Sequence, residues 1–211
     1  MDEFVLKRGL SNIFAAEIIS DEDTEEGYKT GTPFHLIPAG EMSRSASSES
    51  TPVYFDNAVF YQSGSESATE ISITGAALRP ADLARLNAKH VDEETGAVLD
   101  TGEYKEKYFA VGGETKNTDG TKELFWFMKG TFAIPEQTDK TEDDSTDTNG
   151  MTLTFSAIRT KHQFDVAGEK KAMKRVVVDT KTTKLKADQE WTKQVVTPDN
   201  LSTIVEKITT T

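Results

Sequence analysis

The stretch ELFWFMKGTFAI, residues 123–134, decides the fold class of this chain. Alternate positions of this stretch predict one apolar face of a β-strand, formed by Leu124, Trp126, Met128, Phe132 and Ile134. Phe125 and Phe127 point to the opposite face. A strand that is apolar on both faces is covered on both, so we expect this strand to be the best buried in the protein.

Strand and turn patterns extend outward from this stretch in both directions. Residues 107–111 lead into Asp119-Gly120, a pair favoured in two-residue turns, so 107–111 and 123–134 are predicted to form a hairpin. Further runs of β-branched and aromatic residues predict strands at 11–20, 32–38, 69–73, 151–160 and 170–179. The chain is therefore predicted to be mostly β.

One internal helix is predicted. Pro80 suits a first helical turn, and Asp82 lies where the positive end of the helix favours an acid. Leu83 and Leu86 lie three residues apart on one face of a short amphipathic helix that ends near His90.

The chain is expected to divide into a β domain, residues 1–186, and a C-terminal arm, residues 187–211. Within the arm Thr197 suits a helix cap and Pro198 the first helical position. An apolar stripe at helical spacing follows, formed by Leu201, Ile204, Val205 and Ile208. A helix over 197–208 is too short to be stable alone, so we expect this stripe to dock on its own subunit or on a neighbouring one.

Residues 39–50, AGEMSRSASSES, are small and polar and have almost nothing to bury. They predict a loop or an exposed β-ribbon that lies outside the core. The ribbon leads into Tyr54 and Phe55, which need a cover. We therefore expect 39–57 to form a polar projection with an aromatic end.

The chain has 211 residues, with 36 acidic and 24 basic side chains and a net charge of −12. This charge disfavours nonspecific binding to DNA or to an anionic membrane. Residues 159–186 differ from the rest, because they carry nine basic and three acidic residues. This segment either folds against acidic loops of its own subunit or attracts another copy head to tail.

No catalytic or metal-binding pattern is found. Cysteine is absent, and His35, His90 and His162 are far apart in sequence without metal-ligand spacing. Residues 145–150 resemble part of a calcium loop, but Ser156 stands where a bidentate glutamate is needed. No apolar run reaches the ~18 residues of a membrane span, and the start of the chain lacks the features of a signal peptide. We expect a protein that is not an enzyme and needs no cofactor.

Several segments, taken in order, resemble the major tail proteins of long-tailed bacteriophages, most closely the phi13/TP901-1-like family. The likeness covers residues 9–160. Its first half is carried by Leu10–Ile13, Tyr28–Pro33 and Ser43–Asn57. Its second half is carried by the aromatic strand, which is followed by Lys129-Gly130 and a proline-led acidic loop, and by Leu153–Phe155. Two features differ: Thr30 replaces a tyrosine often found before Gly-Thr-Pro, and no immunoglobulin-like C-terminal domain is appended.

The resemblance implies a structural virion protein, made in the host cytoplasm, whose hexameric rings stack into the tail tube. Such a tube encloses the tape-measure protein, meets tail terminator and baseplate proteins, and conducts double-stranded DNA as transient cargo during genome ejection. It implies a β-sandwich or barrel flanked by an α-helix, with a long loop or hairpin and terminal arms, and no enzyme activity, cofactor or membrane partner. Under this reading the ribbon contacts other subunits, through the candidate residues Met42, Ser43, Arg44, Ser48, Glu49, Tyr54 and Phe55.

Three alternatives remain open from the sequence. A tube terminator or a baseplate protein would form single rings instead of stacks. A β-sandwich binding module would present 39–57 and 135–150 as recognition loops. A carboxylate hydrolase needs a pair of acids at a separation that the sequence does not reveal.

Overall fold

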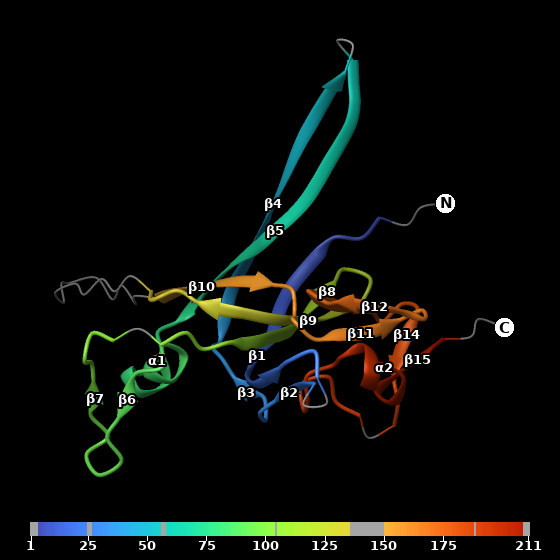
Figure 1. The fold of residues 1–211 in the computed structure, drawn as a ribbon. Coiled ribbons are helices and arrows are strands. Elements are labelled where there is room, and N and C mark those ends of the chain that lie inside the picture. Colours follow the sequence, from blue (N-terminus) through green and yellow to red (C-terminus); the bar gives the residue numbers. More distant parts are fainter. Residues whose placement is uncertain are drawn as a thin grey trace, which may run out of the picture.

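The computed structural model describes residues 4–24, 27–55, 58–103, 105–135, 150–187 and 189–208, and for 47–66 it describes the course of the strands but not the side chains. The described chain is mostly β, as the sequence predicts (Figure 1). The strands of its main sheet are β1 (Lys7–Asp21), β2 (Tyr28–Thr30), β3 (Phe34–His35), β4 (Ala39–Phe55), β5 (Ala58–Ala76), β8 (Phe109–Asn117), β9 (Lys122–Phe132), β10 (Gly150–Ile158) and β13 (Arg175–Asp179). Three small two-stranded sheets pair β6 (His90–Val91) with β7 (Val98–Leu99), β11 (Gln163–Val166) with β12 (Glu169–Ala172), and β14 (Thr183–Leu185) with β15 (Val205–Lys207).

The main sheet is antiparallel and runs in the order β2-β1-β8-β9-β10-β5-β4, with β3 added beside β1. Strand β9 is its branch point. One edge of β9 pairs with β8, as the predicted Asp119-Gly120 hairpin requires, while the other edge is divided between two strands. Residues Glu123–Phe127 pair with β13, and Lys129–Phe132 pair with β10. The aromatic strand that decides the fold class therefore holds both branches of the sheet together.

Strand β9 is buried on both faces, as predicted, but it is not the best buried strand, because eight of the nine residues of β8 are buried against seven of the eleven residues of β9. Leu124, Trp126 and Met128 enter one core cluster, and Phe125 and Phe127 enter the other. Each cluster covers one face of the sheet around β1, β8 and β9, so the fold is sandwich-like. The first core also contains side chains of β5, β10 and α1, while the second also contains side chains of β11, β13 and the C-terminal arm.

The predicted alternation along β9 was wrong beyond Met128. Phe109 pairs with Gly130 and Val111 with Phe127, so β9 has one more residue than β8 between these pairs. Such a β-bulge reverses which face the following side chains meet. Phe132 therefore packs with Phe125 in the first core, and Ile134, beyond the end of the strand, is 62% exposed.

Helix α1 (Pro80–Leu86) forms where the sequence predicts it, with Leu86 buried in the first core and Leu83 packed against it. It ends before the expected boundary, because His90 belongs to β6. Helix α2 (Pro198–Ile204) has Thr197 as its cap: the Thr197 hydroxyl accepts from the backbone N–H of Asn200, and the Asn200 side chain accepts from the backbone N–H of Thr197. None of the described helices is long and apolar enough to cross a membrane.

The helix predicted over 197–208 was too long. The chain becomes extended at Val205, and Val205–Lys207 pair with Thr183–Leu185 as β15 and β14. Ile208 consequently lies outside the helix and is 37% exposed. Ile204 is fully buried in the second core, and Leu201 and Val205 pack against this core.

The C-terminal arm docks on its own chain. The indole Nε1 of Trp126 donates to the Trp191 carbonyl oxygen at 3.1 Å, and Trp191 Nε1 donates to the Phe125 carbonyl oxygen at 3.2 Å. Both indole rings are buried, as are Val195 and Val196. The arm thus closes the second core, and the apolar stripe of α2 is one part of a larger contact.

Asp21, at the end of β1, is a buried carboxylate that links β1 to β9 and to the start of the β10–β11 connection. It accepts hydrogen bonds from Lys129 Nζ at 2.6 Å and from the backbone N–H groups of Lys161 and His162 at 2.9 Å each. Burial alone would raise the pKa of Asp21, but the Lys129 ammonium and these donors outweigh it and hold the pKa below its ordinary value.

The Asp21 linkage predicts acid sensitivity. Because its pKa is lower in the folded chain, its stabilisation is present above about pH 4 and is lost as the pH falls through the folded pKa. Asp21→Asn should cost about 1–3 kcal/mol at pH 7, since Lys129 loses its ionic partner while an amide oxygen still accepts. In urea denaturation the difference in stability between wild type and this variant should narrow as the pH falls below about 4, the ordinary pKa of an aspartate. Glu190→Gln, at an exposed ion pair, is the control; a difference independent of pH would contradict the role of Asp21.

Candidate assembly interface

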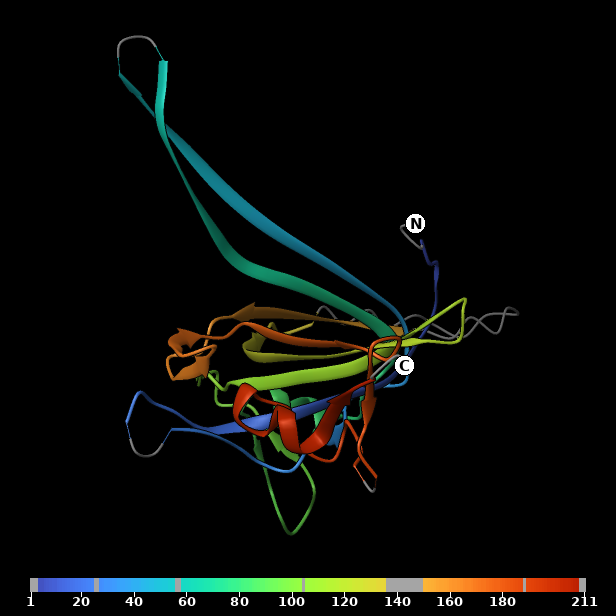
Figure 2. The ribbon, with the colours of Figure 1, turned by 90° about the vertical axis from the view of Figure 1, so that its right-hand side faces the viewer.

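The most prominent surface feature is a long hairpin made by β4 and β5. The two strands pair from Ala39 opposite Gly75 to Phe55 opposite Ala58. Strand β10 supports β5 only from Thr69 onward, so the distal part of the hairpin has no other strand partner among the described residues. Figures 1 and 2 show it projecting away from the body. Eight residues of β4, 48–55, carry it roughly 26 Å at 3.3 Å per residue.

The predicted ribbon is present, but its boundaries were wrong. The sequence interpretation placed a whole exposed ribbon within 39–57, whereas residues 39–55 form one strand of the hairpin and 58–76 form the other. The second strand was missed because the serine-rich stretch 62–69 lacks the apolar alternation by which strands are recognised in a sequence. This stretch nevertheless pairs with the equally polar part of β4.

The seven candidate ribbon residues fall into two groups. Met42, Ser43 and Arg44 lie at the base of the hairpin, opposite residues 71–73 of β5. The other four lie on the projecting part, where Ser48 pairs with Glu66, Glu49 with Ser65, Tyr54 with Val59 and Phe55 with Ala58; their side chains lie outside the described set.

The two best-defined members of the base group have roles within their own chain. Met42 packs against the first core. The guanidinium of Arg44 lies 3.2 Å from Glu123 Oε1, and its carbon lies 4.2 Å from the centre of the Phe125 ring. Arg44 therefore anchors the hairpin base to β9.

Two sheet edges accompany the hairpin. In the described chain β4 pairs only with β5, and β13 pairs only with β9, so each has an outer edge without a strand. Exposed edges carry unpaired backbone donors and acceptors that can accept a strand from another chain. The hairpin and these edges form the candidate interface for other copies.

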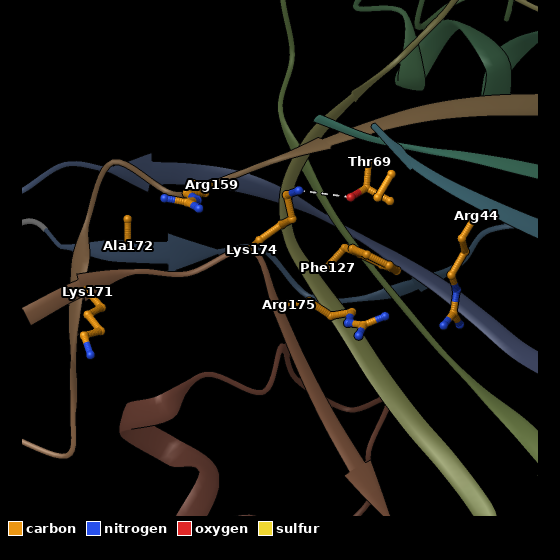
Figure 3. A pocket seen from close by; sticks show the side chains of 9 residues that line it. Arg44, Thr69, Phe127, Arg159, Lys171, Ala172, Lys174 and Arg175 are labelled. Atoms are coloured by element: carbon orange, nitrogen blue, oxygen red, sulfur yellow. Dashed lines mark hydrogen bonds between the residues drawn. The ribbon is translucent and has the colours of Figure 1, made fainter. Parts of the chain in front are cut away.

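A cationic cleft lies where the hairpin base meets β9, β10 and β13, with a volume of about 630 Å³ (Figure 3). Its described lining holds five basic side chains and no acidic one: Arg44, Arg159, Lys171, Lys174 and Arg175. Phe127 forms an apolar part of the wall. The sequence indicated a basic segment at 159–186, but only the fold brings Arg44 to it.

No group of three or more possible metal-ligating side chains occurs in the parts of the chain that the structure describes. His35 meets the edge of the Phe14 ring, His162 meets the Phe164 ring edge to face, and His90 lies in β6. Residues 145–149 of the calcium-like stretch lie outside the described set, and Gly150 begins β10. We therefore assign no site for chemistry.

Comparisons of the chain with models of protein families and with curated proteins give no match. A functional assignment therefore depends on the hairpin, the sheet edges and the charge distribution, together with the likeness noted in the sequence.

Proposed function

We propose that this protein is a structural subunit that self-assembles into stacked hexameric rings, that these rings form a bacteriophage tail tube, and that the tube conducts DNA to the host cell. The observation that carries this proposal is the projecting hairpin. A two-stranded hairpin without further support is only marginally stable in water. A hairpin of this length therefore favours a partner surface, and in a homopolymer that surface belongs to the next copy.

The sequence of the hairpin also supports assembly. Near its turn lie four aromatic residues, Tyr54, Phe55, Phe60 and Tyr61, in an otherwise polar stretch. Aromatic residues are enriched where proteins contact one another. The outer edges of β4 and β13 add a second means of contact, since a closed ring can pair the edges of neighbouring subunits.

Under this proposal the main partner is the protein itself. The tape-measure protein inside the tube, the tail terminator and the baseplate are further partners, and the location is the virion. Double-stranded DNA is transient cargo, and the net charge of −12 on each subunit disfavours its retention. The proposal includes no enzyme activity, cofactor or membrane partner.

Replacing residues 48–66 by an Asn-Gly turn tests the proposal. The shortened chain should fold and melt like the wild type, because β10 supports β5 only from Thr69 onward. It should no longer form tubes, which we expect of the wild type at high concentration in negative-stain electron microscopy.

The control for the shortened hairpin is Glu93→Ser with Glu94→Ser, in the exposed turn between β6 and β7. This variant should assemble like the wild type. Closed single rings of the wild type would favour a terminator or baseplate protein, and a wild type that stays monomeric at every concentration would contradict self-assembly.

A further inference from the structure

We propose that the cationic cleft binds a small anion made of two or three linked phosphate groups, an oligophosphate. The groups that recognise it are the guanidiniums of Arg159 and Arg175, which lie on opposite sides of Lys174 (Figure 3). This inference goes beyond the proposed function, because its ligand is a small molecule and the site needs no second copy of the chain.

Two cations of the cleft lack a counter-charge in the described part of the chain. Arg44 and Lys171 each form an ion pair with a glutamate of their own chain. The exposed guanidinium groups of Arg159 and Arg175 form no hydrogen bond or ion pair with any residue that the structure describes. The cleft therefore keeps a local positive charge, although the chain as a whole carries a net charge of −12.

The backbone already holds these side chains on one frame. The backbone N–H of Thr160 donates to the Met173 carbonyl oxygen at 2.9 Å, and the backbone N–H of Met173 donates to Thr160 Oγ1 at 3.0 Å. These two bonds tie the segment that carries Arg159 to the segment that carries Lys174 and Arg175. Little backbone has to be ordered when a ligand binds, which favours affinity.

Two arginines of the cleft face the same aromatic ring. The guanidinium carbons of Arg44 and Arg175 lie 5.6 and 5.7 Å from the centre of the Phe127 ring. Burial lowers the pKa of Arg44, and the positive charge of Arg175 lowers it further, because the two cations repel each other. An anion beside Arg175 would offset this repulsion.

Phosphate suits these donors better than carboxylate. Guanidinium pairs with either group through two parallel hydrogen bonds, but a terminal phosphate has three strong acceptor oxygens. One such group can therefore meet a guanidinium and the Lys174 ammonium together. The cleft volume of about 630 Å³ lies within the range of small-molecule sites, roughly 300–1,000 Å³, and exceeds what one phosphate fills. Two or three linked groups fill more of the cleft and reach both Arg159 and Arg175.

The surroundings of the cleft disfavour larger ligands that carry phosphate. Phe127 is the one aromatic side chain in the described lining and is only 1% exposed, so it offers no face on which a nucleobase could stack. Duplex DNA would have to approach a subunit with a net charge of −12, whereas a small anion meets the local positive field. The structure therefore favours recognition of the phosphate groups alone.

Titration calorimetry with tripolyphosphate tests the site, in metal-free buffer at low salt and below the concentration at which the full-length protein polymerises. Tripolyphosphate should bind the wild type about tenfold or more tightly than inorganic phosphate, because a single phosphate does not reach both arginines. The cleft variant, Arg159→Gln with Arg175→Gln, should weaken tripolyphosphate binding by about tenfold or more. Arg159→Lys with Arg175→Lys keeps both charges but loses the paired donors, so its affinity should lie between those of the wild type and the cleft variant.

The matched control is Arg8→Gln with Arg79→Gln, which removes the same charge at two exposed arginines outside the cleft. This variant should bind tripolyphosphate within about twofold of the wild type, because salt screens distant surface charges. Far-UV circular dichroism of all variants checks that they fold. Equal weakening in the control and the cleft variant would assign the effect to net charge and overturn the proposal.

Chemical modification locates the ligand without any substitution. Phenylglyoxal reacts with accessible guanidinium groups, and mass spectrometry identifies the modified arginines. Saturating tripolyphosphate should protect Arg159 and Arg175 and leave the exposed Arg8 and Arg79 reactive. Equal protection of all four arginines, or protection of none, would overturn the proposal.

Competition against tripolyphosphate defines the chemistry of the ligand. Adenosine triphosphate should compete no better than tripolyphosphate itself, because the base finds no partner in the cleft. Citrate, a tricarboxylate, and a short DNA duplex should compete about tenfold or more weakly. Tighter binding of any of these three competitors, or a wild type that binds no tripolyphosphate, would overturn the inference whether or not the protein forms tubes.

Discussion

Truncating the chain after Asp188 should abolish its cooperative unfolding transition at 25 °C. The truncation removes four buried apolar side chains of the second core, Trp191, Val195, Val196 and Ile204. At roughly 1.5–3 kcal/mol each, their burial contributes about 6–12 kcal/mol before the entropy of ordering the arm is subtracted. This is comparable to the entire stability of a typical domain, about 5–15 kcal/mol. Circular dichroism during heating and urea titration would measure the loss.

Two point variants in the arm give reference values for the loss of stability caused by the truncation. Ile204→Ala should destabilise the protein by about 2–5 kcal/mol, because it leaves a cavity in a fully buried site. Lys193→Ala, at an exposed ion pair with Glu190, should change stability by less than about 1 kcal/mol. If the truncated chain melted like the wild type but failed to polymerise, the arm would dock on a neighbouring subunit in solution, contrary to the contacts seen in the structure.

The sequence predicted those parts of the fold that short-range patterns determine. The hairpin at Asp119-Gly120, the buried aromatic strand and the start of α1 follow from turn chemistry, apolar alternation and the position of Pro80. The residues at which helices and strands end were harder to predict from the sequence. Helix α2 stops at Ile204 because Val205–Lys207 find backbone partners in β14, which an apolar stripe at helical spacing cannot reveal.

The candidate interface was only partly predictable for the same reason. The polar composition of residues 39–50 indicated exposure, but the second strand of the hairpin is equally polar and gave no strand pattern. The bulge near Met128 depends on how β8 and β9 align, and it moves Phe132 to the other face. The cleft depends on contacts between distant segments, since Arg44 joins Arg159 and Arg175 only after β4, β10 and β13 take their places.

Trp126→Ala should have the largest effect of any single substitution considered, about 3–5 kcal/mol in the free energy of unfolding. Trp126 is 0% exposed and lies at the centre of the second core. Its ring fills the space over Gly112 so closely that a Cβ built there would lie 2.4 Å from the ring. Alanine would leave a cavity, and it would also remove the donor to the Trp191 carbonyl oxygen.

Two further variants separate packing from hydrogen bonding at Trp126. Trp126→Phe keeps an aromatic ring but removes the indole donor, so its cost should be smaller, with about 1–3 kcal/mol arising from the unpaired Trp191 carbonyl. Val177→Ala, on the neighbouring strand β13 at a side chain that is 40% exposed, should cost about 1 kcal/mol or less. Because Trp126 and Trp191 share both packing and hydrogen bonds, the costs of Trp126→Ala and Trp191→Ala should not add in the double variant. Urea denaturation of the four single variants and the double variant measures these differences, and a cost below about 1 kcal/mol for Trp126→Ala would refute the burial of β9 in the second core.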